Sequence, residues 1–317
     1  MACQPMTDQP TPTIGIIGAG AMGALFGAHL AETGADPLLV DVNPAVVERL
    51  KTDGVTLHRL SDVRRVPVRA TTDPASEPPV DVLLLFVKCY ATDAALALAA
   101  PLIGDRTLVL SLQNGWGNAD RVTAVVAPER VFAGVTYHSA TLVAPGVVEH
   151  TAIGRTYLGP VAGGAGSEAE RLRDALAGAD LEAEITDEIA ALMWRKLTLN
   201  ASANPVAAIT GLRAGALVEV PEVFALIEGI AREVAAVGQA RGDAIDADLA
   251  VADVRDSLVK AGPATSSMRQ DVAAGRRTEF DVITGAVLRE AEQSGVEVPL
   301  TRVIHALLCG YEAGRSA

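Results

Sequence analysis

The sequence has few cysteines, fewer basic than acidic residues and no long hydrophobic run. Its three cysteines, Cys3, Cys89 and Cys309, show neither metal-ligand spacing nor a disulfide framework, so we expect no metal site and a reducing, cytoplasmic location. The formal net charge of −13 argues against nucleic-acid or anionic-membrane partners, which require clustered Lys and Arg. The uncharged, largely apolar stretch of residues 197–212 is shorter than the roughly 20 apolar residues that cross a bilayer.

Lysine is also scarce, since four lysines stand against twenty-two arginines. Arginine does not release its proton in a protein, whereas lysine can. Lys196 is followed at intervals of four by Asn200 and Asn204. On a helix such positions differ in direction by only about 40°, so the three side chains should form a polar strip. The strip fits a ligand site. It equally fits a buried helix in which the asparagine amides form hydrogen bonds with neighbouring backbone groups and the lysine forms an ion pair.

The length and the hydrophobic pattern predict two domains. A chain of 317 residues exceeds the size at which single cores usually stop growing. Residues 13–187 alternate short apolar runs with helical segments, which predicts an α/β domain with a doubly wound, mostly parallel sheet. Residues 188–317 contain long Ala-, Val- and Leu-rich helices and predict an all-α domain. Residues 1–12 lack the features of a signal peptide and are expected to be a disordered tail.

Individual elements follow from the same periodicities. Residues 137–159 are expected to form hairpin strands that extend the main sheet, and the apolar helix at 228–240 could serve as core or as a homodimer interface. Strands are predicted at 13–17, 38–40, 80–87, 108–110 and 131–136, and helices at 22–33 and 45–52.

A glycine-rich turn between the first strand and the first helix predicts a Rossmann dinucleotide-binding domain. In the pattern G-x-G-x-x-G the glycines permit a tight turn, close approach of a pyrophosphate and close helix packing. Asp41 ends the second strand, where a carboxylate accepts hydrogen bonds from a ribose and repels a 2'-phosphate, so NAD is favoured over NADP. Alternatively, Asp41 only caps the next turn with Asn43. The predicted cofactor-binding turn comprises Gly18, Ala19, Gly20, Ala21, Met22 and Gly23.

Other polar residues occupy positions that suit a site. Lys88 and Asn114 each follow a predicted strand, and the carboxyl ends of parallel strands bind ligands in doubly wound sheets; ordinary turn chemistry is the alternative. Ser267 and Gln270 have capping-box spacing, which predicts a hydroxyl at a helix start. Glu279 taken alone is an ordinary charged residue. Arginines 49, 59, 64 and 65 lie downstream of Asp41 and complicate the choice of cofactor.

Six motifs in order resemble the ketopantoate reductase (2-dehydropantoate 2-reductase) family across nearly the whole chain: G-A-G-A-M-G, F-V-K-C-Y, Q-N-G-W-G, W-R-K-L-T-L-N-A-S-A-N-P, S-S-M-R-Q-D and T-E-F-D-V-I-T-G. The resemblance implies a Rossmann domain, a helical domain and an active site between them. It also implies NAD(P)H-dependent reduction of a small 2-oxo acid, 2-dehydropantoate, to (R)-pantoate in pantothenate and coenzyme A biosynthesis.

The resemblance also implies roles for single residues. Lys196 would be the general acid and Glu279 the carboxylate beside it that contacts substrate and cofactor. Burial would lower the pKa of Lys196 and Glu279 would raise it, so the sequence leaves the sign of the shift open. Substrate oxygens would be held by Asn114, Asn200, Asn204 and Ser267, and the cofactor and the cleft would be lined by Lys88, Asn114 and Ala140.

One departure from the family concerns the cofactor. Many members carry an arginine for the 2'-phosphate after the second strand, whereas this chain has Asp41 and Val42. NAD(H) is therefore favoured, and NADP(H), the family norm, stays open. NAD-dependent D-2-hydroxyacid dehydrogenases that act on other 2-oxo acids are an alternative. The β-hydroxyacid dehydrogenases share K-x-x-x-N but have glycine-rich segments that this chain lacks, and a non-catalytic NAD-binding sensor would leave the helical motifs unexplained.

Overall fold

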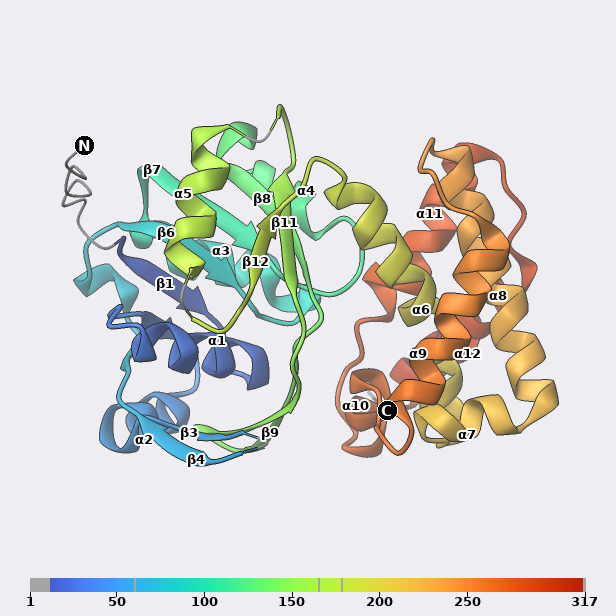
Figure 1. The fold of residues 1–317 in the computed structure, drawn as a ribbon, viewed down its shortest axis with the longest axis horizontal. Helices are drawn as coiled ribbons and strands as arrows, with labels where there is room; N and C mark the ends of the chain where they lie inside the picture. The colour runs from blue at the N-terminus through green and yellow to red at the C-terminus, as the bar shows by residue number, and fades with distance from the viewer. Residues whose placement is uncertain (1–11, 60, 165, 178, 316–317) are drawn as a thin grey trace, which may run out of the picture. The chain divides into compact units, whose positions relative to one another are not determined.

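The computed structural model describes residues 12–59, 61–164, 166–177 and 179–315, so the predicted tail lies outside the described residues except for Pro12. The chain divides into two compact units (Figure 1). The α/β unit comprises Met1–Val87, Ala91–Gln113 and Arg121–Asp187. The helical unit comprises Lys88–Tyr90, Asn114–Asp120 and Glu188–Ala317, so two short segments from the first half of the chain belong to it.

The α/β unit is built on an eight-stranded sheet with the order β12-β11-β8-β7-β6-β1-β2-β5. Neighbouring strands from β5 to β8 are parallel, and β11 is antiparallel to β8. The chain moves outward from β1 to β2 and returns to β6 on the other side of β1, which confirms the doubly wound prediction. The strands are β1 (Ile14–Ile17), β2 (Leu38–Val40), β5 (Arg69–Thr71), β6 (Val80–Leu85), β7 (Ile103–Ser111), β8 (Val131–Thr136), β11 (Thr156–Pro160) and β12 (Ala183–Ile185).

The hairpin predicted in residues 137–159 exists, but the prediction that it extends the main sheet is wrong. Strands β9 (Ser139–Ala144) and β10 (Val147–Ala152) join β3 (Val55–His58) and β4 (Val63–Val66) in a separate sheet of order β4-β3-β10-β9. Only β11 from that region extends the main sheet. Strands β3 and β4 are not among the predicted strands, and a strand pattern does not by itself identify a distant partner.

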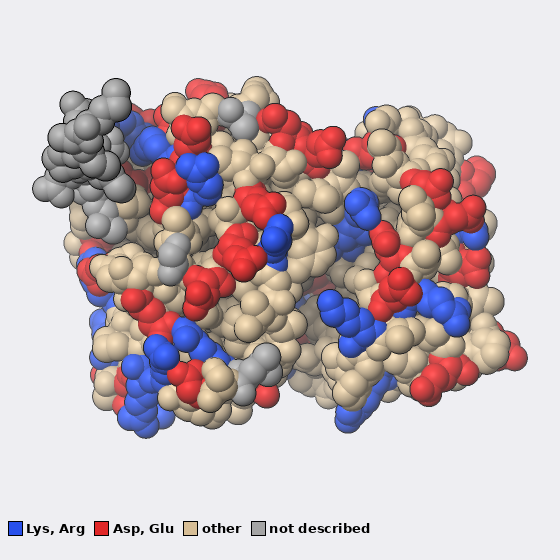
Figure 2. Space-filling model, in the orientation of Figure 1, with Lys and Arg blue, Asp and Glu red and all other residues tan. Residues whose placement is uncertain are grey.

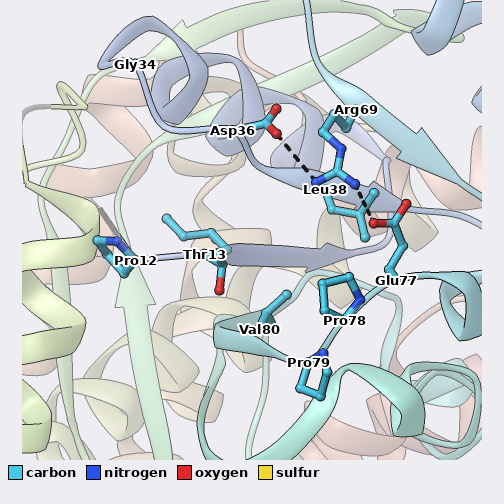
Figure 3. Close-up of a pocket in the computed structure, with 11 residues that line it drawn as sticks. Pro12, Thr13, Gly34, Asp36, Leu38, Arg69, Glu77, Pro78, Pro79 and Val80 are labelled. Atoms are coloured by element: carbon cyan, nitrogen blue, oxygen red, sulfur yellow. Dashed lines mark hydrogen bonds and ion pairs between the residues drawn. The ribbon is translucent and has the colours of Figure 1, made fainter. Parts of the chain in front are cut away.

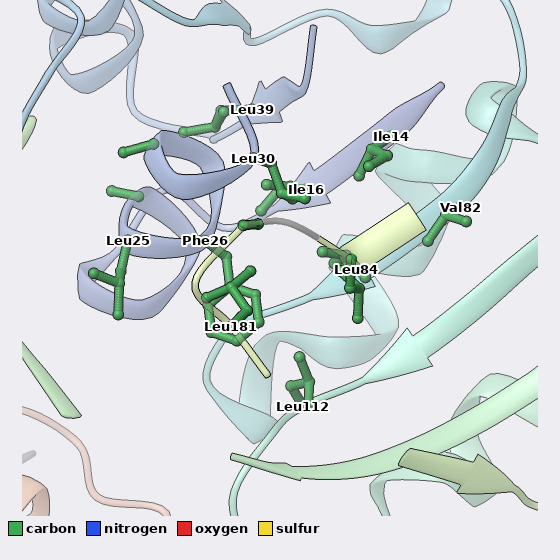
Figure 4. Close-up of a cluster of buried hydrophobic side chains, with 14 of the residues drawn as sticks. Ile14, Ile16, Leu25, Phe26, Leu30, Leu39, Val82, Leu84, Leu112 and Leu181 are labelled. Carbon is green, nitrogen blue, oxygen red and sulfur yellow. The ribbon is translucent and has the colours of Figure 1, made fainter. Parts of the chain in front are cut away.

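Helix α1 (Ala21–Glu32) lies between the two sheets and contacts β1, β2, β3, β9 and β10. Figure 1 shows it between β1 and the pair β3 and β9. Its residues from Gly23 to Leu30 are all buried, as expected for a helix that is apolar on every face. Leu25, Phe26 and Leu30 pack with Ile16 and Leu84 in the core shown in Figure 4. This packing on both sides fixes the start of α1.

Shorter helices complete the α/β unit and the connections between the units. They are α2 (Pro44–Asp53), α3 (Thr92–Ala99), α4 (Asn118–Thr123) and α5 (Ser167–Leu176), with 3-10 turns η1 (Pro74–Ser76), η2 (Cys89–Ala91), η3 (Ala100–Leu102) and η4 (Pro128–Arg130).

The helical unit is organised around the long helix α6 (Ile189–Thr210), which contacts α8, α9, α10 and α12. Trp194 of α6 is fully buried and donates its indole N–H to the carbonyl of Val234 at 2.9 Å. The apolar face of α8 is buried in this core, so core is the role that the structure gives to residues 228–240. The other elements are α7 (Ala214–Glu219), α8 (Pro221–Ala240), α9 (Ala247–Ala261), α10 (Ser267–Ala273), η5 (Phe280–Val282), α11 (Thr284–Ser294) and α12 (Pro299–Arg315). None of the described helices combines the length and hydrophobicity that a bilayer crossing requires.

Candidate active site

The glycine-rich turn between β1 and α1 has the geometry of a pyrophosphate site. Gly18 has a φ of +97°, a conformation that L side chains rarely adopt. A Cβ on Gly23 would collide with the carbonyl oxygen of Gly18, whereas a Cβ on Gly20 would meet nothing within 4 Å. The start of α1 has no side-chain cap and no acidic residue in its first turn, so its free N–H groups suit an anion. These residues therefore fit a dinucleotide.

Asp41 lies at the end of β2 and is joined to the same turn. Its Oδ2 accepts the N–H of Ala19 at 2.9 Å, and its Oδ1 accepts the N–H of Asn43 at 2.9 Å. The helix cap itself is Asn43, whose side chain accepts the N–H of Ala45. Each carboxylate oxygen has a second lone pair, so Asp41 can still accept ribose hydroxyls.

The arginines downstream of Asp41 are largely engaged in ion pairs. Arg49 Nε lies 2.8 Å from Asp53 Oδ2, Arg64 Nε lies 2.6 Å from Asp62 Oδ2, and Arg59 is paired with Glu32. In Figure 2, blue and red side chains are intermixed over this part of the α/β unit. These local pairs reduce the charge that Arg49, Arg59 and Arg64 could offer to a 2'-phosphate.

The polar strip lies on α6 as the spacing predicts. Asn204 donates its side-chain N–H to Asn200 Oδ1 at 3.2 Å, so the two amides are neighbours on one face. Lys196 precedes them by one turn and is partly exposed. Loss of hydration in the surrounding protein lowers the pKa of Lys196 from 10.5 to about 8. The pKa of Lys196 is therefore shifted downward, in the direction that burial favours.

Lys88 has the opposite environment. Its Nζ lies 2.8 Å from Asp271 Oδ2 and 3.0 Å from Glu279 Oε2. Burial lowers the pKa of Lys88, but the carboxylates of Glu279 and Asp271 outweigh that effect and raise it to about 12. Glu279 is itself buried, and its Oε1 accepts the N–H of Cys89 at 3.0 Å. The described partners of Glu279 are thus Lys88 and Cys89.

The segment that carries Asn114 is anchored inside the helical unit by both tryptophans of the chain. Trp116 and Trp194 pack edge to face at 5.3 Å between ring centroids. The guanidinium of Arg241 lies over both rings, and Arg241 Nη1 lies 2.7 Å from Glu290 Oε2. The indole N–H of Trp116 donates to Glu290 Oε1 at 3.0 Å. These contacts fix the backbone on which Asn114 stands.

Comparison with known proteins identifies the family to which these features belong. The model described as Ketopantoate reductase PanE/ApbA matches residues 14–163, and its C-terminal counterpart matches residues 188–312. The chain is 32% identical to 2-dehydropantoate 2-reductase of Pyrococcus horikoshii over 300 residues, which cover 94% of this chain and 97% of that protein. The chain belongs to the ketopantoate reductase family. It is accordingly an oxidoreductase that uses a nicotinamide cofactor.

Solved structures agree with this membership. A PanE/ApbA family ketopantoate reductase from Ralstonia eutropha has a TM-score of 0.86 and 32% identity, covering 96% of this chain and 100% of that one. A D-mandelate dehydrogenase in a ternary structure with NADH and anilino(oxo)acetate has a TM-score of 0.91 and 27% identity, covering 96% and 99%.

The structure places two further residues expected from the family resemblance, Ser267 and Ala140. Ser267 is not the helix cap, as its spacing suggests, but the first residue of α10; the cap is Ser266, whose Oγ accepts the N–H of Arg269 at 3.3 Å. The correction moves the capping function by one residue and leaves Ser267 in the first turn. Ala140 lies on β9 in the second sheet, paired with His150.

The structure adds residues that the sequence analysis overlooks. Asp271 is buried, holds Lys88 through one oxygen and accepts the Nε–H of Arg276 through the other at 3.0 Å. Arg241 and Glu290 support the segment of Asn114. Asp271 is the last residue of the S-S-M-R-Q-D motif. Its place in that motif is the one sequence signal that could have identified Asp271 as a site residue.

A pocket of about 190 Å³ in the α/β unit is a poor candidate for the reaction (Figure 3). It is lined by Thr13, Ile14 and Val80, at the amino ends of β1 and β6. Arg69 also lines it and forms ion pairs with Asp36 and Glu77. The glycine-rich turn follows the opposite, carboxyl end of β1, where doubly wound sheets bind their ligands.

Proposed function

We propose that this chain reduces 2-dehydropantoate to (R)-pantoate with NAD(P)H, on the route to pantothenate and coenzyme A. Its membership of the ketopantoate reductase family and its 32% sequence identity to the 2-dehydropantoate 2-reductase of Pyrococcus horikoshii support this substrate. The observation that carries the chemistry is Lys196, whose pKa of about 8 suits a proton donor because the best catalytic pKa lies near the working pH.

The residues of the helical unit divide the work of the reaction. When bound, the reduced nicotinamide supplies the hydride that the carbonyl carbon accepts. Lys196 donates its Nζ proton to the carbonyl oxygen as negative charge develops there, which requires a separation of about 2.6 to 3.2 Å. Asn200, Asn204 and Ser267 hold the substrate oxygens through N–H and O–H donors. Lys196 is partly exposed, so it regains its proton from solvent.

Lys88 and Glu279 have a different task in this proposal. With its pKa raised to about 12, Lys88 stays charged and serves as a fixed positive group near cofactor and substrate. Glu279 positions it, together with Asp271. Two lysines with pKa values shifted apart separate the proton donor from the permanent charge.

We also propose that NADH is preferred to NADPH. Asp41 is held by Ala19 and Asn43, so its charge stands beside the glycine-rich turn and repels a 2'-phosphate. Comparing kcat/KM for the two cofactors tests this preference. A strong preference for NADPH would reject it.

A second candidate is an NAD-dependent D-2-hydroxyacid dehydrogenase that acts on another 2-oxo acid. Asp41 and the similarity to the D-mandelate dehydrogenase described with NADH and anilino(oxo)acetate favour it. A panel of 2-oxo acids assayed with both cofactors separates the candidates. Turnover of ketopantoate supports the first, turnover of other acids without ketopantoate supports the second, and cofactor binding without any turnover leaves a sensor.

A further inference from the structure

The residue directly before Glu279 is held by the last helix of the chain. Thr278 is almost fully buried. It donates its backbone N–H to Glu312 Oε1 at 2.6 Å and its hydroxyl to the same oxygen at 2.9 Å. The other oxygen of Glu312 accepts the Nε–H of Arg315 at 3.0 Å. Glu312 and Arg315 both belong to α12, so one carboxylate of this helix fixes the backbone and the side chain of Thr278.

Helix α12 also holds the chain on the two sides of Thr278 and Glu279. The hydroxyl of Tyr311 donates to the carbonyl of Arg276 at 3.2 Å. The ring of His305 packs against that of Phe280, with 5.1 Å between the ring centroids. Contacts from α12 therefore begin before Glu279 and continue after it.

The position of Glu279 depends on such contacts. Residues 276–279 form neither helix nor strand, so a regular pattern of backbone hydrogen bonds does not fix them. The carboxylate of Glu279 nevertheless meets two partners closely, since it lies 3.0 Å from Lys88 Nζ and accepts the N–H of Cys89 at 3.0 Å. Hydrogen bonds weaken beyond about 3.2 Å, so a small shift of this segment would break both.

We propose that Glu312 is a positioning residue for the ion pair between Lys88 and Glu279. By holding Thr278, it keeps the Glu279 carboxylate within hydrogen-bond distance of Lys88. Glu312 acts through Thr278 and takes no part in the chemistry itself. The effect of this ion pair on catalysis rests on the proposed reductase function, whereas the geometry of the pair can be tested without cofactor or substrate.

The cofactor-free test is limited acetylation of the lysines with acetic anhydride, which modifies neutral amines. Mass spectrometry follows Lys88, and exposed Lys260 is the internal reference. Glu312→Ala should speed the acetylation of Lys88 by about 10-fold, because losing a neighbouring carboxylate lowers a lysine pKa by about one unit or more. Glu312→Gln keeps an oxygen that accepts both bonds from Thr278 and should label like wild type.

Glu233 of α8 provides a matched control at the other end of α12. One of its oxygens accepts the N–H and the hydroxyl of Thr301 at 2.8 and 2.7 Å, and the other accepts the N–H of Leu300 at 2.8 Å. Glu233→Ala therefore removes the same kind of hydrogen bond from the same helix. It should leave the acetylation of Lys88 unchanged. Equal acceleration in Glu233→Ala and Glu312→Ala would overturn the proposal, because general loosening of α12 would then explain both.

Kinetics with ketopantoate and NADH test the consequence for catalysis. Glu312→Ala should lower kcat/KM by about 10- to 100-fold, because a misplacement of about 1 Å can cost about 100-fold, whereas Glu233→Ala should retain it. Combining Glu312→Ala with Glu279→Ala should add little to the loss in Glu279→Ala alone, because residues that act through one interaction are not additive.

The outcomes separate the two proposals. Unchanged acetylation of Lys88 in Glu312→Ala, or fully additive losses of kcat/KM, overturns the positioning role. Absence of turnover by wild type rejects the ketopantoate reductase function, and acetylation still decides the positioning role. Urea denaturation reports whether each variant is folded. If Glu312→Ala does not fold, Thr278→Val, which removes only the hydroxyl bond, should speed the acetylation of Lys88 by a smaller factor, and an unchanged rate there overturns the proposal.

Discussion

At the residue scale, the two lysines of the candidate site show how environment assigns a role to one side-chain type. The protein around Lys196 removes water from its amine, which lowers its pKa to about 8. Lys88 lies between two carboxylates, which raise its pKa to about 12. Only Lys196 can exchange its proton near neutral pH. The sequence singles out both residues, but the sign of each shift depends on neighbours from distant segments.

We predict that Lys196→Ala lowers kcat by about 10²- to 10⁴-fold, the usual contribution of a general acid. Steady-state assays with saturating cofactor measure the effect. Lys260→Ala removes the same charge from an exposed position of α9 and should retain kcat. Normal turnover in Lys196→Ala with folded protein would remove this lysine from the mechanism.

The pKa of Lys196 also predicts opposite pH dependences for the two directions. Reduction needs the protonated amine, so its rate should fall as pH rises through about 8. Oxidation of the hydroxy acid needs the neutral amine, so its rate should rise over the same range. Profiles of kcat from pH 6 to 10 in both directions check this; profiles that run in parallel would contradict it.

For the cofactor, Asp41→Asn should reduce the ratio of kcat/KM for NADH over NADPH by about 10-fold, because about 1.4 kcal/mol of charge repulsion corresponds to that factor. Asparagine keeps a side-chain oxygen that can accept the N–H of Ala19 or of Asn43, so the turn should be largely preserved. Kinetics with both cofactors provide the measurement. An unchanged ratio would mean that this carboxylate does not select the cofactor.

At the scale of elements, local patterns predict the glycine-rich turn and its flanks well. Strand β2 coincides with the predicted residues 38–40, and α1 and α2 differ from their predictions by one residue at each end. These elements carry their own signals, which are an apolar run, a glycine turn and a helix cap. The start of α10 is less clear because two adjacent serines, Ser266 and Ser267, both suit a cap.

The structure predicts different consequences for these two serines. Ser266→Ala removes the Oγ that accepts the N–H of Arg269 and should lower the free energy of unfolding by about 1 kcal/mol. Ser267→Ala should leave stability nearly unchanged and raise KM for the 2-oxo acid. Urea denaturation and steady-state kinetics separate the two effects. The reverse assignment, with Ser267→Ala the less stable variant, would restore Ser267 as the cap.

At the scale of the whole molecule, three of the five histidines gather inside the α/β unit. His138 Nδ1 lies 3.0 Å from His150 Nε2, and the rings of His29 and His150 are 5.4 Å apart. Burial, together with Arg59 and the other two histidines, lowers the pKa of His29 from 6.5 to about 4. Burial also lowers the pKa values of His138 and His150. Asp180 acts on the pKa of His29 in the other direction, as Glu182 does on that of His138, and Glu32 Oε2 lies 4.0 Å from His29 Nδ1.

This cluster predicts that the protein loses stability in mild acid. The folded state keeps His29 neutral, whereas the unfolded chain binds a proton below pH 6.5, so stability falls as pH drops from about 6.5 toward 4. For His29 alone the loss between pH 7 and pH 5 should be about 2 kcal/mol. Chemical denaturation at the two pH values measures it.

A matched pair of variants isolates the contribution of His29. His29→Leu should lose less stability than wild type between pH 7 and pH 5, because no imidazole remains to be protonated there. His58 lies on β3, in the same sheet as His150 on β10, but outside the cluster. The His58→Gln variant should therefore behave like wild type. Equal losses in His29→Leu and wild type would show that the cluster does not control acid stability.

The sequence by itself determined the family, the doubly wound sheet, the helical second half and the polar strip, because each is encoded by neighbours along the chain. Tertiary structure alone decided that β10 pairs with β3, that Glu279 and Asp271 hold Lys88, and that five alanines line a pocket that also includes Asn204. Those features join residues far apart in the chain. Their energies depend on burial and on distances between side chains, which exist only once the chain has folded.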